Sequence, residues 1–126
     1  MKIFEVEENE DFIDQLKDIL SKIKTLGVQK MIEFSDINPI VKENYFKVLK
    51  EFLNQLNEII KQSKKNSTAR RLMRKIHTQM EKDRDWYRKQ IIKSKGDDFH
   101  FYRGQSLARS DILHLLSDLR YLNSGK

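Results

Sequence analysis

The 126-residue sequence has no cysteine, a single proline and only four glycines, and it contains no apolar run long enough to cross a bilayer. The missing cysteines exclude disulfide bonds, thiolate metal ligands and cysteine nucleophiles. The scarcity of proline and glycine leaves few helix breakers. The first twenty residues carry acidic residues where a signal peptide has a basic end and an apolar run, so they do not resemble a signal peptide. We therefore predict a single helical domain over residues 1–126, cytoplasmic and without a membrane partner.

Apolar residues recur at steps of three and four along most of the chain, which is the period of a helix that buries one face. The predicted fold class is therefore all-α, a small bundle of about four main helices. Two of these helices are long for a chain of this size, which favours dimerisation or a protruding basic arm. The four helices are predicted at residues 10–26, 39–62, 68–95 and 106–122.

Glycine and proline positions predict where these helices begin and end. Gly27 and Gly96 stand just after the first and third helices, where glycine often adopts the left-handed conformation. Pro39 suits the first turn of the second helix, and Ser67 or Thr68 would cap the third. The remaining segments are predicted to be an extended start over 2–6, a short helical turn over 28–34 and a loop or small hairpin over 97–105.

The predicted helix over 39–62 has the widest apolar face in the chain. Phe46, Leu53 and Ile60 extend its main stripe to about 160° around the helix axis. A stripe of that width is typical of a helix that contacts more than one neighbour. The second neighbour is either another helix of the bundle or a second copy of the chain in a homodimer.

Positive charge is concentrated in the second half of the chain. Residues 1–60 hold twelve acidic and eight basic residues, whereas residues 61–126 hold seven acidic and seventeen basic residues, including all eight arginines. A strong positive potential attracts polyanions whatever fold lies beneath it. The asymmetry favours a phosphate-rich or acidic partner; the alternative is an ordinary solvated helix face.

The densest positive charge lies in the segment over 61–75, which contains seven basic residues and no acidic residue. It covers the predicted start of the third helix, where the helix dipole makes each base unfavourable by about 0.3–1 kcal/mol. Free backbone N–H groups and hydroxyls at the same place suit a phosphate, which the bases would also stabilise. The candidate phosphate contacts in this segment are Lys64, Lys65, Arg70, Arg71, Arg74 and Lys75.

A row of basic residues continues along the predicted third helix. At about 100° per residue, its members fall within about 40° of one another and opposite the predicted buried face. The row is about 33 Å long, comparable with several nucleotides of backbone. Asp85 lies at its edge, four residues before Lys89, with which it is expected to pair. The row consists of Arg71, Lys75, Lys82, Lys89 and Lys93.

Aromatic residues near the row are candidates for stacking on the nucleobases of DNA or RNA. Trp86, the only tryptophan, lies between the row and the buried face, where it would either stack on a base or cover a neighbouring helix. In the segment over 97–105, alternation would turn the two phenylalanines inward. His100 and Tyr102 would then face outward beside Arg103, which is a further candidate contact.

Signals for an enzyme are sparse. Arg70 and His77, with six residues between them, resemble the arginine-to-histidine motif of the helical ribonuclease domains known as HEPN, although Arg71 replaces the polar residue that commonly follows the arginine. This resemblance implies a ribonuclease. Asp111 and His114 have the spacing of half a di-metal site in a helical bundle, but no second pair completes it. Neither a metal nor a cofactor is therefore expected.

These features predict a non-enzymatic protein that binds the backbone of DNA or RNA through the basic row, with little base-specific readout. The first alternative is an adaptor or inhibitor that docks its basic helix on an acidic protein. The second alternative is the HEPN-like ribonuclease.

Overall fold

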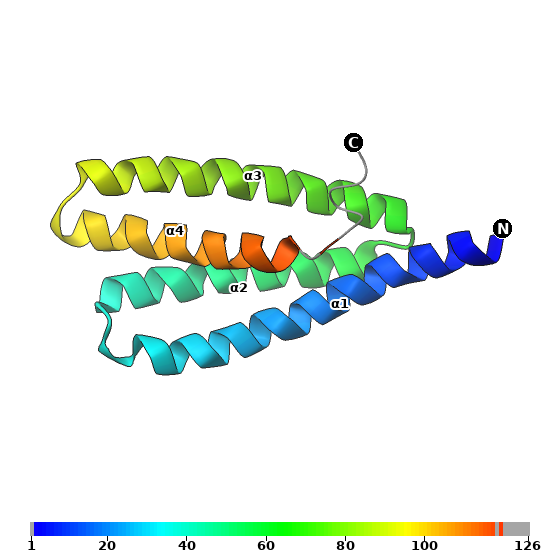
Figure 1. Ribbon diagram of the computed structural model, residues 1–126, viewed down its shortest axis with the longest axis horizontal. Coiled ribbons are helices and arrows are strands. Elements are labelled where there is room, and N and C mark those ends of the chain that lie inside the picture. Colours follow the sequence, from blue (N-terminus) through cyan, green and yellow to red (C-terminus); the bar gives the residue numbers. More distant parts are fainter. Residues whose placement is uncertain (1, 118, 120–126) are drawn as a thin grey trace.

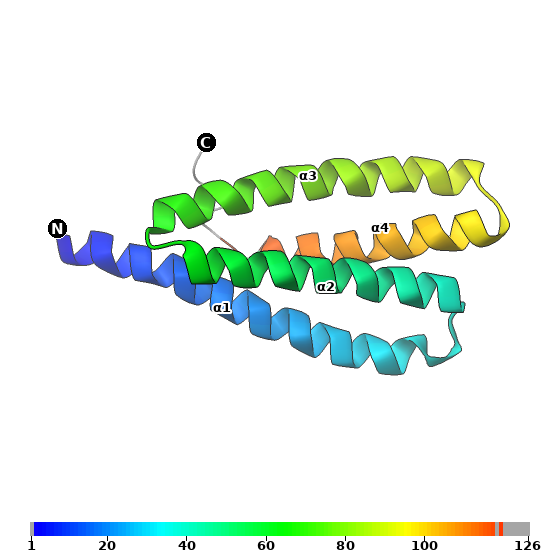
Figure 2. The same cartoon turned by 180° about the vertical axis from the view of Figure 1, so that it is seen from behind.

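The computed structural model describes residues 2–117 and 119, with side chains from residue 12 onward. This described chain is an all-α bundle without strands, which confirms the predicted fold class (Figure 1, Figure 2). None of its helices combines the length and the apolar character needed to span a bilayer. The helices are α1 (Lys2–Glu33), α2 (Pro39–Gln62), α3 (Asn66–Lys93) and α4 (Gly96–Leu116), with a short 3-10 helix, η1 (Phe34–Asp36), between α1 and α2.

α4 lies between α2 and α3 in the bundle (Figure 1). It has extensive contacts with both of them, whereas α2 and α3 touch each other little. α1 packs mainly along α2 and crosses it at an angle, and its first turns continue past the α2–α3 connection (Figure 1, Figure 2). The bundle is therefore closed around α4 and more open along α1.

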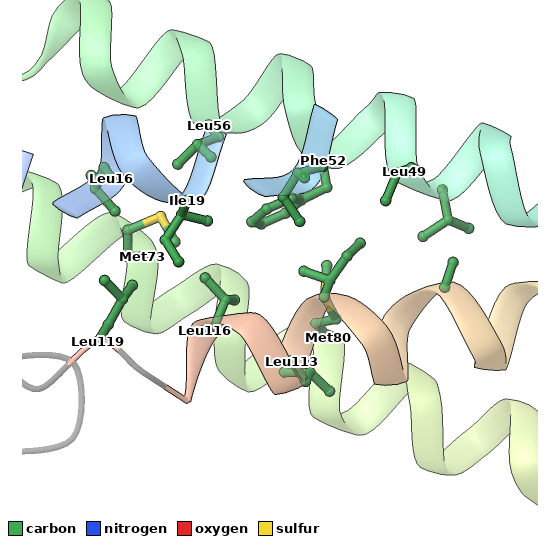
Figure 3. Close-up of a cluster of buried hydrophobic side chains, with 14 of the residues drawn as sticks. Leu16, Ile19, Leu49, Phe52, Leu56, Met73, Met80, Leu113, Leu116 and Leu119 are labelled. Carbon is green, nitrogen blue, oxygen red and sulfur yellow. The ribbon is translucent and has the colours of Figure 1, made fainter. Parts of the chain in front are cut away.

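Apolar side chains from all four helices fill the space between them (Figure 3). α2 contributes a continuous buried stripe at steps of three and four, as its sequence period predicts. Phe52 projects from this stripe with 1 % of its surface exposed. Other large buried residues are Leu16, Ile19 and Ile23 of α1, Tyr45 and Leu56 of α2, Met73 and Met80 of α3, and Ile112, Leu113 and Leu116 of α4.

α2 begins and ends at the predicted residues, 39 and 62. Pro39 occupies its first turn, where a fixed φ and a missing N–H are compatible with a helix. The side chain of Asn38 caps this turn by accepting a hydrogen bond from the N–H of Ile40 at 2.9 Å. The chain arrives there through η1, whose Phe34 meets Tyr45 edge-on at 4.9 Å between ring centroids.

The predicted boundaries of the first helix are wrong, because α1 is continuous from Lys2 to Glu33. The start over 2–6 is helical, at the end of the helix dipole that acidic residues stabilise. Gly27 does not end the helix; a Cβ atom there would lie 3.4 Å from Leu49 Cδ2 in α2. The predicted separate turn over 28–34 is mostly the last turn and a half of α1.

The predicted loop over 97–105 is also wrong, because these residues form the first half of α4. Gly96 has a left-handed φ of 62° but begins α4. Asp97 and Asp98 stand in the first turn, where the helix dipole favours acidic residues. The predicted end of the last helix at residue 122 lies outside the described residues.

Gly104 is a packing residue in the middle of α4. A Cβ atom there would lie 2.6 Å from the carbonyl oxygen of Val41 and 2.8 Å from Asn44 Cβ. No side chain fits at that distance unless the backbone shifts, so the glycine allows α4 to approach α2 closely.

A chain of polar side chains joins α2 to α4 and reaches α3. Asn44 Nδ2 donates to the carbonyl of Ile40 at 2.8 Å, and Asn44 Oδ1 accepts from Gln105 Nε2 at 2.9 Å. Arg109 Nη1 donates to Gln105 Oε1 at 2.7 Å, and its guanidinium lies 4.8 Å from the centroid of the Tyr87 ring. The two buried amides are thus paired, which avoids the cost of desolvating them alone.

A second polar contact links α1, α2 and α4. The buried Tyr45 donates from its hydroxyl to Asp111 Oδ2 at 2.6 Å. Lys30 Nζ lies 3.8 Å from the same carboxylate and 2.8 Å from Glu33 Oε2. Burial and the hydrogen bond to Asp111 raise the pKa of Tyr45, and the hydrogen bond to Glu33 raises the pKa of Lys30. Both groups therefore hold their protons more tightly than in the unfolded chain.

Candidate nucleic-acid interface

The start of α3 has neither a side-chain cap nor an acidic residue. The predicted cap at Ser67 or Thr68 is wrong, since the N-cap residue is Lys65 in an extended conformation. Asn66 does not cap the turn either, because its Oδ1 accepts a hydrogen bond from the N–H of Ile13 in α1 at 3.1 Å. The first turn of α3 thus lacks the usual stabilisation of a helix N-terminus and is flanked by exposed positive charge.

Five bases form an exposed row on the outward face of α3. Spacings of four and seven residues keep them on one side, opposite the buried Ala69, Met73 and Met80. At about 1.5 Å per residue the row extends for about 33 Å. Within the described part of the chain, none of the five takes part in an ion pair or a side-chain hydrogen bond. The row, as predicted, comprises Arg71, Lys75, Lys82, Lys89 and Lys93.

Neighbouring charged residues of α3 have partners away from the row. Asp85 does not pair with Lys89 as predicted; its Oδ1 lies 3.2 Å from Arg84 Nε. Arg88 Nη2 donates to Ser110 Oγ of α4 at 3.1 Å. These contacts leave the positive charge of the row without a directly opposed acidic group among the described residues.

Two of the predicted contacts, Arg70 and Arg74, are half-buried on the flank of α3. The guanidinium of Arg70 lies 5.4 Å from the centroid of the Phe12 ring, a cation–π contact that ties α3 to α1. The Nε atom of Arg74 is buried and has no hydrogen-bond partner in the described structure. Both arginines are thus less accessible to a long polyanion than the row, whereas Lys64 and Lys65 of the α2–α3 connection are exposed.

Trp86 lies beside the row with 52 % of its surface exposed. Its ring meets Tyr87 edge-on at 5.1 Å and Tyr102 of α4 at 5.9 Å between centroids. Trp86 therefore covers part of a neighbouring helix and also presents open ring surface. The predicted alternation after Gly96 is wrong: Phe101 is exposed and Tyr102 is half-buried. Arg103 is exposed on α4, outside the row.

The two residues of the HEPN-like motif are held by different neighbours. Arg70 contacts Phe12, whereas His77 Nδ1 lies 3.2 Å from Glu81 Oε1. Seven positions separate them, which is about 10 Å along a helix axis. Asp111, the acidic residue of the half di-metal pattern, accepts a hydrogen bond from the Tyr45 hydroxyl. The described residues contain no group of three or more side chains placed to hold a metal ion.

No protein-family model, curated protein or solved structure matches the chain. Function is therefore inferred from the described residues themselves.

One surface that the sequence prediction missed lies at the end of α1. Val28, Met31 and Ile32 are exposed by 65 %, 54 % and 74 %. Because the sequence predicts that Gly27 ends the helix, it also predicts that these residues form a connecting turn. Continued at the helical period, they fall outside the core stripe of α1, and this is the sequence signal that could have identified them.

Proposed function

We propose that the protein binds the phosphate backbone of DNA or RNA through the row of bases on α3, without catalysing a reaction. The observation that carries the proposal is the row itself, five exposed bases on one helix face with no acidic partner among the described residues. Each phosphate that a basic side chain neutralises releases condensed counterions. This release supplies affinity for any nucleotide sequence. A length of about 33 Å lets several phosphates bind at once.

The exposed ring surface of Trp86 favours the binding of single-stranded nucleic acid, whose nucleobases are free to stack on it. Stacking of one base on an aromatic side chain contributes about 1–3 kcal/mol and tolerates any sequence. A duplex keeps its bases stacked on each other, so it gains nothing from the tryptophan. We therefore expect Trp86→Ala to weaken binding of single-stranded oligonucleotides and to leave duplex binding unchanged, as measured by fluorescence anisotropy.

The main test measures affinity for random-sequence oligonucleotides against salt concentration. The test variant changes Arg71, Lys75 and Lys82 to Gln, since all three are exposed and unpaired in the described structure. Loss of three phosphate contacts should lower the salt slope by about 2–3 units. Thermal melting should be unchanged or slightly higher, because repulsion near the start of α3 is reduced.

A matched control changes three other exposed lysines to Gln, so that both variants have the same net charge. The control residues are Lys17, Lys22 and Lys47. If both triple variants lose the same affinity, net charge and not the row is responsible. A flat salt response of the unchanged protein, or no binding at about 50 mM salt, would remove the nucleic-acid proposal.

One observation favours the second candidate, an acidic protein partner. Ile92 is 86 % exposed close to Lys89 and Lys93, and an apolar side chain contributes more to a protein interface than to a phosphate contact. If the protein binds polyglutamate but no oligonucleotide, and the Arg71, Lys75 and Lys82 variant abolishes that binding, the row is a docking surface for an acidic protein.

A further inference from the structure

α1 and α2 leave an apolar groove between them on the side away from α4. Val28 and Met31 of α1 form one wall, and Phe46 and Leu53 of α2 form the other. Val28 and Met31 are more than half exposed, so the groove is open to solvent. We call this feature, together with Lys24 and Lys50 at its rims, the α1–α2 groove. An exposed apolar surface of this kind marks an interaction site more often than a plain solvated surface.

The charge of the groove restricts what fits it. Lys24 on α1 and Lys50 on α2 line it, and none of the residues described as lining it is acidic. A suitable occupant is therefore a helix with apolar residues for the groove and acidic residues for the lysines.

The first turns of the chain have this composition. Residues 2–11 contain five acids and one base, together with Ile3, Phe4 and Val6. Their backbone is helical, and it continues beyond the bundle past the α2–α3 connection (Figure 1, Figure 2). This acidic helical segment lies at the opposite end of α1 from the groove, so it can reach the groove only of a second molecule.

The spacing along α1 supports such an arrangement. The groove residues Lys24, Val28 and Met31 follow one another at steps of four and three. Continued toward the N-terminus, the same row of threes and fours passes through the half-buried Leu20, the exposed Lys17 and the half-buried Ile13. It then reaches residues 10, 6 and 3 of the acidic segment. One face of α1 is therefore suited to packing along its whole length.

We infer that the protein forms a two-fold symmetric dimer in which the α1 helices run antiparallel and the acidic first turns of each occupy the α1–α2 groove of the other. A two-fold axis near residue 17 sets Ile3 opposite Met31, Val6 opposite Val28 and Glu10 opposite Lys24. Two apolar pairs and one pair of opposite charges are thus brought together on each side of the axis, and the two copies of Lys17 meet at the axis as like charges. Because the same patch serves both copies, the assembly closes at two.

The register is tested first by cross-linking, since the chain has no cysteine of its own. A single Lys17→Cys variant should form a covalent dimer on mild oxidation, because two copies of residue 17 meet at the axis. Lys47→Cys is the control: it is exposed on α2 away from the groove and should stay uncross-linked. Val6→Cys and Val28→Cys should each fail to cross-link alone, and the double variant should form the dimer.

Charge exchange tests the pairing of Glu10 with Lys24. Sedimentation over a wide range of protein concentration should show a dimer. Glu10→Lys alone and Lys24→Glu alone should each raise its dissociation constant about tenfold. The variant with both changes should regain most of the affinity, because the two pairs are then reversed but still complementary.

Several outcomes would overturn the inference. A wild-type monomer at all concentrations would do so, as would a dimer that survives Val28→Glu with Met31→Glu. Equal cross-linking of Lys17→Cys and Lys47→Cys would show random collision. If a monomer instead binds vesicles of phosphatidylcholine and phosphatidylserine through Val28 and Met31, the groove belongs to a membrane surface. If it binds a free acidic amphipathic peptide, the groove belongs to another protein.

Discussion

α2 meets α4 on one flank and α1 on the other, and the two contacts are filled to different degrees. Against α4, Gly104 has no room even for a Cβ atom, and Asn44 shares a hydrogen bond with Gln105. Against α1, the added Cβ of Gly27 would stand at an ordinary 3.4 Å from Leu49, and an apolar groove remains open. One helix thus has a closed flank and an open flank.

The difference shows that the width of an apolar stripe and its coverage are separate properties. The stripe of α2 extends through Phe46 and Leu53 beyond what α4 and the core cover, and both residues remain only partly buried. The excess stripe is the part that faces the α1–α2 groove. A wide stripe therefore predicts that a second neighbour exists, and only the packing shows on which flank it binds.

The largest effect on stability is expected when a buried residue of α2 is replaced, and its neighbour at the groove provides the comparison. Phe52→Ala should lower the free energy of unfolding by about 2–5 kcal/mol, because it removes a buried ring and leaves a cavity. Leu53→Ala should cost less than half as much, since Leu53 is partly exposed at the groove. Urea unfolding of both variants at one low protein concentration measures the difference. Equal losses would show that the groove is not open.

Gly104→Ala tests the closed flank directly. Because the added methyl group meets the Val41 carbonyl oxygen at 2.6 Å, α4 must shift away from α2, and we expect a loss of about 1–3 kcal/mol. The shift should also disturb the hydrogen bond between Asn44 and Gln105. Urea unfolding gives the loss in stability. Wild-type stability of this variant would mean that the α2–α4 contact has more space than the structure shows.

How much of this fold could be read from the sequence depended on what each glycine does. α2 was predicted at its correct ends because Pro39 signals a helix start and its apolar period is uninterrupted. The prediction that Gly27 ends a helix is wrong, because Gly27 lies inside α1 at a contact with α2. Local sequence cannot distinguish a glycine that ends a helix from one that admits a neighbour.

The candidate site was predictable only in part, because helical spacing places the basic residues but does not fix the partners of their neighbours. The row on α3 follows from helical spacing alone, so Lys75, Lys82 and Lys89 are exposed together as predicted. The partners of flanking residues depend on rotamers and on other helices. Asp85 pairs with its neighbour Arg84, a contact that spacing along a helix does not predict.

Alkaline pH should weaken the link that joins both flanks, in which Asp111 of α4 contacts both Tyr45 of α2 and Lys30 of α1. The pKa of Tyr45 is raised above its ordinary 10.0 and that of Lys30 above 10.5, so the folded state keeps protons that the unfolded chain releases. Stability from these groups is complete below about pH 10 and falls as the pH rises further.

Replacing the tyrosine separates the two contributions. Tyr45→Phe should cost about 1–2 kcal/mol at neutral pH through the lost hydrogen bond, and its stability should then decline less steeply above pH 10 than that of the unchanged protein. Thermal melting from pH 8 to pH 11 provides the comparison. Parallel declines in the two proteins would mean that Tyr45 has no raised pKa in the folded state.

The smallest effect, and one of opposite sign, is expected on the open flank. Gly27→Ala should stabilise the fold by up to about 1 kcal/mol, because alanine loses less conformational entropy in a helix interior and the new methyl group meets Leu49 Cδ2 at an ordinary contact distance. Gly96→Ala serves as the control, since the left-handed φ of Gly96 should make the same change destabilising there. Thermal melting at one protein concentration measures both. A loss of stability in Gly27→Ala comparable with that of Gly104→Ala would show that α1 packs on α2 as tightly as α4 does, and the distinction between the two flanks would then fail.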